Sequence, residues 1–133
     1  MGEWIEAIIV PNRPVQGALQ IASYKNSKRN EQDISAVCSA LAIGVDRGVV
    51  THCRIAYGGM AGTPKRATFA EGVLLGNSWS EASVRAAMAA LEQDYSPLAD
   101  MRASAAYRMQ VAQNLLLRFW LEASGEAVAT SVF

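Results

Sequence analysis

A continuous polar stretch between two apolar runs contains the side chains best suited to bind a ligand. It runs from Lys25 to Asp33 and has nine polar or charged residues and no hydrophobic residue. Lys25, Lys28 and Arg29 can donate hydrogen bonds to a phosphate, a ribose or a flavin edge, whereas Glu31 and Asp33 can anchor the turn. A solvated connection of balanced charge fits the same residues equally well. Residue types alone leave both interpretations open.

Glycines mark a second stretch, between Gly58 and Lys65, in which chemistry is conceivable. A glycine-rich turn between a strand and a helix can bind a phosphate through its backbone N–H groups. The P-loop pattern fails here, because Lys65 follows Pro64 and precedes Arg66, where the motif requires a serine or a threonine. The spaced glycines of a dinucleotide-binding motif are missing as well. We therefore predict a tight structural joint, with an anion contact at the helix N-terminus as the alternative.

Metal and nucleophile chemistry have few candidates in this sequence. His52 is the single histidine, and Cys38 and Cys53 lack the spacing of metal ligands. His52 is expected to be a solvated or hydrogen-bonded residue on a strand. Cys38 is expected roughly 10 Å along the sheet from the position opposite Cys53, which is beyond the reach of a disulfide. We expect two free thiols and no complete active site.

Composition excludes several classes of partner. The 133 residues include 12 basic and 12 acidic side chains, and 51% of them are hydrophobic. A formal net charge of zero gives no electrostatic reason to expect a nucleic acid or an anionic membrane as partner. No apolar run reaches the ~18 residues of a membrane span, and the N-terminus lacks the basic region of a signal peptide. We expect one domain with its own core, in the cytoplasm.

Alternating apolar residues predict four strands in the first half of the chain. These cover Trp4–Val10, Ala18–Tyr24, Ile34–Val45 and Val49–Tyr57. The third segment is long enough for a helix. Gly44 near its end and the turn residues Asp46, Arg47 and Gly48 favour a strand that pairs with the fourth in antiparallel orientation.

Helical spacing of apolar residues predicts three helices in the second half, over Thr63–Leu75, Glu81–Asp94 and Ser104–Ala123. Thr63 and Pro64 have the residue types of a helix start, and Gly76 those of a helix end. Either Ser78 or Ser80 is expected to cap the second helix. Gly125 is expected to cap the third.

This order predicts an α+β fold: an antiparallel sheet of about four strands followed by three helices packed on one face. Residues 1–133 would form a single domain, with residues 126–133 as a frayed tail. The third helix is the most apolar. It is expected either in the core or at an interface with a partner.

Four stretches of sequence together resemble a known family. They are YKNSKRNEQDI at 24–34, RIAYGGMAGTPKR at 54–66, WSE at 79–81 and YR at 107–108. These residues resemble the C-terminal subdomain of the FAD-binding flavoprotein of the xanthine dehydrogenase family, a domain that carbon monoxide dehydrogenase flavoproteins share. The resemblance runs from Trp4 to about Glu122. It looks closest to the bacterial small subunit that carries the iron–sulfur and FAD domains.

The resemblance implies a molybdenum hydroxylase that oxidises hypoxanthine and xanthine to urate. Electrons would pass from a molybdopterin centre through 2Fe–2S clusters to FAD and then to NAD. In this family the loop that matches Lys25 to Asp33 lies near the flavin. Lys25 matches the loop lysine and is the implied FAD contact, while Arg29 and Asp33 match charged positions that shape the site. The implied partners are upstream FAD-binding and iron–sulfur domains and a molybdopterin subunit.

Two departures from the family qualify this expectation. Gln32 stands where the family often has an acidic residue, which removes one negative charge near the flavin. The upstream segments that bind the FAD pyrophosphate are also missing. The chain is therefore expected to be a fragment of a longer protein, inactive alone and without bound FAD. The alternative is a freestanding interaction module that uses its apolar third helix as a homo-oligomer or partner surface.

Overall fold

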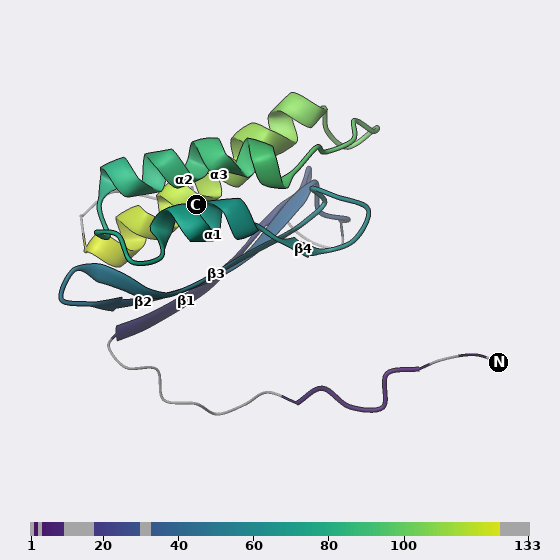
Figure 1. Cartoon of the computed structure of the whole chain (residues 1–133). Helices are drawn as coiled ribbons and strands as arrows, with labels where there is room; N and C mark the ends of the chain where they lie inside the picture. Colours follow the sequence, from purple (N-terminus) through teal and green to yellow (C-terminus); the bar gives the residue numbers. More distant parts are fainter. Residues whose placement is uncertain (1, 3, 10–17, 30–32, 126–133) are drawn as a thin grey trace.

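A four-stranded antiparallel sheet with three helices over one face makes up the structure, a computed structural model that describes residues 2, 4–9, 18–29 and 33–125 (Figure 1). The strands lie in chain order across the sheet and are β1 Ala18–Asn26, β2 Val37–Asp46, β3 Val49–Gly58 and β4 Lys65–Arg66. The helices are α1 Thr68–Leu74, α2 Glu81–Asp94 and α3 Ala105–Ser124. The predicted α+β fold is confirmed.

The hairpin of β2 and β3 forms the centre of the sheet. Its two-residue turn places Arg47 at φ 49° and Gly48 at φ 78°, the pair of left-handed residues that a type I′ turn requires. A bulge between Gly44 and Val45 shifts the register near this turn. The strand interpretation of the Ile34–Val45 run is confirmed, although the strand itself is Val37–Asp46.

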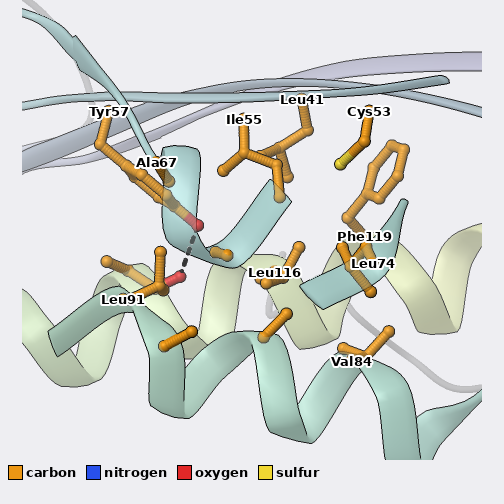
Figure 2. Packing of buried hydrophobic residues seen from close by; sticks show 14 of the residues in the cluster. Leu41, Cys53, Ile55, Tyr57, Ala67, Leu74, Val84, Leu91, Leu116 and Phe119 are labelled. Carbon is orange, nitrogen blue, oxygen red and sulfur yellow. Dashed lines mark hydrogen bonds between the residues drawn. The ribbon is translucent and has the colours of Figure 1, made fainter. Parts of the chain in front are cut away.

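The core lies between the sheet and the helices. Inward side chains of β2 and β3 meet apolar side chains of all three helices, including Leu41, Ile55, Leu74, Leu91 and Leu116 (Figure 2). Each such fully buried large side chain stabilises the fold by about 1.5–3 kcal/mol. Tyr57 is also fully buried and satisfies its hydroxyl by donating to the Ala112 carbonyl at 2.8 Å.

The predicted N-terminal strand is wrong for the residues that the structure describes. Residues 4–9 have no strand assignment, and Trp4, Ile5, Ile8 and Ile9 are all at least 80% exposed; Val10 lies outside the described residues. An alternating pattern forms a strand only where a neighbouring strand pairs with its backbone groups. The fourth strand of the sheet is instead β4, which pairs with Ala56 and Tyr57 of β3.

The first helix begins at Thr68, five positions after the predicted start at Thr63. The reason is a contact that local sequence does not reveal. Asp94, at the end of α2, accepts hydrogen bonds from the backbone N–H groups of Phe69 and Ala70, both at 3.0 Å. This carboxylate caps α1 from 24–25 residues away, whereas the N-cap residue Ala67 has no side chain that can do so.

The other helix ends follow local rules. Ser80, one of the two candidates, caps α2 by accepting from the Ser83 N–H, and Ser104 caps α3 in the same way. Gly125 ends α3 at φ 73°, as predicted. Four apolar residues of α3 are buried in the core: Ala112, Leu116, Phe119 and Trp120. The prediction that α3 contributes to the core is confirmed for these residues, and its use as a partner surface stays a prediction.

Both cysteines are free, as predicted. Cys53 lies opposite Ile43 in the sheet, two positions from the expected one, while Cys38 lies opposite Gly58. Burial, with a smaller contribution from Glu71, raises the pKa of the Cys53 thiol to about 12. None of the described helices has the length and apolarity that a bilayer crossing requires. The predicted frayed tail, 126–133, lies outside the described residues.

Candidate functional site

Lys25 lies near the end of β1, on the face of the sheet that the helices leave open. Side chains alternate along β1, and Tyr24 points toward α3, where its hydroxyl donates a 2.5 Å hydrogen bond to Glu122. Lys25 therefore points to the other face. Its side chain is exposed and makes no hydrogen bond or ion pair with any described residue. The sequence prediction put Lys25 in a loop; a paired strand holds it instead.

Arg29 and Asp33 lie in the loop that follows β1 and are brought together through the backbone. The Asp33 carboxylate accepts a 3.2 Å hydrogen bond from the Arg29 N–H. Ser27 donates to the Arg29 carbonyl at 2.6 Å, and Lys28 Nζ donates to the Met101 carbonyl at 3.0 Å. Asp33 therefore anchors the turn, as its position predicts, while the exposed Arg29 side chain has no hydrogen bond or ion pair to another described residue.

Arg108 in the first turns of α3 holds this end of the molecule together. Its side chain is only 5% exposed. The guanidinium donates to the carbonyl of Ala36, three residues after the polar stretch, and to the carbonyl of Gly59 at 3.0 Å. Its other terminal nitrogen forms a 2.6 Å ion pair with Asp100. One buried side chain thus ties three loops together by charge-assisted hydrogen bonds.

Asp100 is the acidic member of this cluster. Its carboxylate accepts from the backbone N–H groups of Arg102 and Ala103 and from the guanidinium of Arg108. The Arg102 N–H makes the largest contribution, and together these donors hold the pKa of Asp100 well below its usual range against the opposing effect of desolvation, which is the second largest contribution. Asp100 therefore stays charged and keeps the loop before α3 attached to Arg108.

Two pockets open beside these loops. The larger, of about 380 Å³, lies between the end of β1 and the start of α3 and is lined by residues that include Asn26, Ser27, Lys28, Arg102, Ser104 and Tyr107. The smaller, of about 220 Å³, is lined in part by Lys28, Arg29, Asp33 and Arg102. These linings contain hydroxyls, an amide and several cations, which can bind an anionic or hydrogen-bonding group.

The glycine-rich joint packs against the same loops. Gly59 has φ 81°, and a Cβ there would collide with the Ala36 carbonyl, so both the backbone angle and the space require glycine. At Gly58 a Cβ would come within 2.6 Å of Cys38 Sγ. The joint closes against the polar loop, in agreement with the structural interpretation. Because α1 begins only at Thr68, no helix follows the glycines directly.

Of the three predicted site residues, the structure brings only two close together. Arg29 and Asp33 share a loop and a pocket, whereas Lys25 lies on the open sheet face and does not line the described pockets. Sequence reasoning missed the clamp formed by Arg108 and Asp100. The residue pair 107–108 contributed to the family resemblance, but no local pattern gave Arg108 its role, because its acceptors are 49 and 72 residues away.

Catalytic machinery of other kinds is not found among the described residues. No three His, Cys, Asp or Glu side chains within residues 2, 4–9, 18–29 and 33–125 could together hold a metal ion. His52 lies on β3 opposite Gly44, half-buried. Cys53, with its raised pKa, is a protonated core thiol rather than a nucleophile.

Sequence comparison identifies relatives over most of the chain. Residues 22–123 match the family described as the CO dehydrogenase flavoprotein C-terminal domain. A xanthine dehydrogenase of Emericella nidulans is 30% identical over 130 residues, which are 96% of this chain and 10% of that protein. A nicotinate hydroxylase of the same organism is 30% identical over 90% of this chain and 9% of its own length.

Solved structures give the same result. A carbon monoxide dehydrogenase from Hydrogenophaga pseudoflava matches with a TM-score of 0.71 and 30% identity, over 78% of this chain and 36% of that one. A quinoline 2-oxidoreductase from Pseudomonas putida 86 has the same fold, with a TM-score of 0.70 over 83% of this chain and 38% of its own. The chain thus spans about a tenth of the curated relatives and a little over a third of the solved chains.

Proposed function

The chain belongs to the CO dehydrogenase flavoprotein C-terminal domain family, and from this membership we propose that it forms the C-terminal part of the FAD-binding unit of a molybdenum hydroxylase. Its role is to close one side of the flavin site that upstream domains build. The isolated chain binds no FAD and is inactive, because one sheet face and one loop supply only part of a cofactor pocket.

Lys25 is the observation that carries this proposal. An exposed ammonium on a paired strand, with no partner in the described part of the chain, is a donor suited to an acceptor outside this domain. A flavin presents carbonyl oxygens and ring nitrogens as hydrogen-bond acceptors along one edge, so the Lys25 ammonium is a suitable donor to it. When bound, FAD would accept electrons and pass them on. Arg29 and Asp33 shape the neighbouring loop: Asp33 closes it, and the Arg29 side chain is left available.

For the reaction, we propose a xanthine dehydrogenase that oxidises hypoxanthine and xanthine and passes electrons through FAD to NAD. The 30% identity to a xanthine dehydrogenase over 96% of the chain supports this choice. The nicotinate hydroxylase is equally identical over a slightly shorter length. The purine-binding residues would belong to a molybdopterin subunit, and 2Fe–2S domains would connect that subunit to the flavin. These domains are the proposed partners.

The flavin assignment is tested by Lys25→Ala in the complete flavoprotein. We expect the ratio of flavin absorbance to protein after gel filtration to fall several-fold, because one charge-assisted hydrogen bond of about 1.5–3 kcal/mol is lost. Lys25→Arg keeps the charge and should retain more flavin. Arg85→Ala, on the exposed side of α2, is the matched control and should leave occupancy unchanged. Full flavin occupancy in Lys25→Ala would remove Lys25 from the site.

The isolated 133-residue chain provides a second test. We expect purified protein to be colourless and to show no saturable change in flavin fluorescence when FAD is added, because the pyrophosphate-binding part of the site lies elsewhere. The absorbance near the flavin maximum measures this directly. A yellow preparation with one flavin per chain would mean that most of the pocket lies within these residues.

A further inference from the structure

The sheet has two faces of very different character. Helices α1, α2 and α3 cover one face, and no described element covers the other (Figure 1). An antiparallel sheet with a solvated face normally carries polar side chains there. The central strand β2 does not, because its outward positions are the exposed Ala40, the half-buried Cys38 and Ala42, and Gly44, which is buried. This face has the composition of a covered surface.

Neighbouring strands extend the apolar area. Ile21 of β1 lies beside Ala42 and is 71% exposed, and Ala56 of β3 lies beside Ala40, whose other neighbour is the small polar Ser23. Small side chains on the middle strand leave a flat surface that another backbone can approach closely. A flat apolar area of this kind in a soluble protein marks an interaction site.

The charges on this face are also uncompensated. Arg54 lies beside Ala42 in the register and is exposed, and neither Arg54 nor Lys25 has an ion-pair partner among the described residues. The one acidic side chain at an outward position of the described strands is Asp46, at the hairpin end. A partner would therefore have to present apolar side chains at the centre and carboxylates opposite Arg54.

The exposed surfaces of α2 and α3 carry paired charges instead. Glu81 and Arg85 form an i,i+4 ion pair on α2, and Arg118 and Glu122 form another on α3. Such pairs are typical of a helix face that remains in water. The segment 4–9 adds to the contrast, because its large apolar side chains are also uncovered just upstream of β1. Large apolar side chains are also exposed elsewhere, on Phe69 of α1 and on Leu98 and Met101 before α3. The sheet face differs from those places because its small apolar residues lie side by side on paired strands.

We infer that the open sheet face, centred on Ala40 and Ala42 and bordered by Lys25 and Arg54, is the docking surface for the FAD-binding part that precedes this domain in the flavoprotein. The family is described as a C-terminal domain, and this chain covers 36% of the solved carbon monoxide dehydrogenase chain. The remaining length in such a relative is ample to form a second layer over the sheet. This inference rests on the proposed function, because Lys25 projects from the same face.

Thiol labelling in the assembled flavoprotein tests the inference. Cys38→Ser removes the half-buried thiol of this domain, and Cys53 is buried; subtracting the labelling of the Cys38→Ser protein removes the contribution of thiols elsewhere. Ala40→Cys then reports on the sheet face, and Ala86→Cys, at an exposed position of α2, is the matched control. We expect a maleimide to react at least tenfold more slowly with the thiol of Ala40→Cys than with that of Ala86→Cys, and equally fast with both after unfolding. Equal rates in the folded protein would overturn the inference.

Two further measurements separate the possible explanations. Protection of Ala40→Cys that disappears when the protein is diluted would point to a second copy of this chain and would also overturn the inference. Ala40→Arg should displace the domain and lower flavin content, whereas Ala86→Arg should not. If Lys25→Ala keeps its flavin while Ala40→Cys stays protected, the docking surface stands and only the proposed role of Lys25 fails.

Discussion

One cluster of charged residues surrounds α1, and another lies at the start of α3. The two differ in how many of their charged side chains find partners within the domain. Beneath α1, the buried carboxylates of Glu71 and Asp94 have donors within the domain. At the start of α3, the buried Arg108 is paired with the exposed Asp100, but the cations Lys25 and Arg29 have no partners among the described residues. Charged side chains that are paired within the domain stabilise the fold. Those that have no partner among the described residues are available to bind a group outside the domain.

The largest expected effect on the free energy of unfolding comes from the cluster around α1, which includes Glu71. Glu71 is 7% exposed and accepts from the Ile55 N–H at 2.8 Å and from the Arg66 guanidinium. Glu71→Ala leaves that N–H buried without an acceptor and should lower the free energy of unfolding by about 3 kcal/mol. Glu81→Ala removes an exposed i,i+4 partner of Arg85 and should cost less than about 0.5 kcal/mol. Urea unfolding monitored by circular dichroism measures both.

A similar loss in the two variants would mean that the Glu71 cluster contributes no more than a surface pair. Flavin per folded molecule in the complete flavoprotein should be normal for Glu71→Ala, because this cluster is closed within the domain.

The sequence predicted best what is decided locally. The β2–β3 hairpin follows from alternation and from the Arg47–Gly48 turn, and α2 and α3 begin at serine caps. The start of α1 could not be predicted, because the cap is the distant carboxylate of Asp94. The N-terminal segment has a strand-like pattern, but none of the described strands pairs with it.

The same division applies to the candidate site. Lys25, Arg29 and Asp33 were found because they are close in sequence and match a family pattern. Arg108 was not assigned a role, because its three acceptors come from loops that meet only after the chain has folded. A long-range hydrogen bond leaves no periodic or composition signal in the sequence.

Arg108 should give the second largest effect. Arg108→Lys keeps the positive charge but loses the planar group that reaches Ala36, Gly59 and Asp100 at once. We expect the free energy of unfolding to fall by about 2 kcal/mol, because at least one buried carbonyl is left without a donor. Unlike Glu71→Ala, this variant should also loosen the polar loop after β1.

Limited proteolysis distinguishes this prediction from a general loss of stability. Trypsin should cleave Arg108→Lys faster after Lys28 or Arg29 than it cleaves a Glu71→Ala sample under conditions where both are fully folded. The flavin content of the complete protein should fall for Arg108→Lys. Equal cleavage rates in the two variants would show that Arg108 does not control this loop.

The smallest effect depends on pH and comes from Asp100. Its pKa in the folded protein lies below the ordinary value of 3.8 because the Arg102 N–H, with help from Arg108 and the Ala103 N–H, stabilises the charged form. The carboxylate therefore binds fewer protons in the folded state than in the unfolded state. Its stabilising contribution is complete well above pH 3.8 and is lost as the pH falls through that value toward the lower folded pKa.

Asp100→Asn should remove this part of the pH dependence. Wild type and variant should differ most in melting temperature at pH 6–7, and the difference should shrink on acidification below about pH 4. Asp46→Asn, at the exposed hairpin end, is the matched control. A constant difference between wild type and Asp100→Asn from pH 7 to pH 3 would show that folding does not lower the pKa of Asp100 and that its bonds to Arg102, Ala103 and Arg108 are not formed in solution. The clamp would then depend on the two carbonyl acceptors alone.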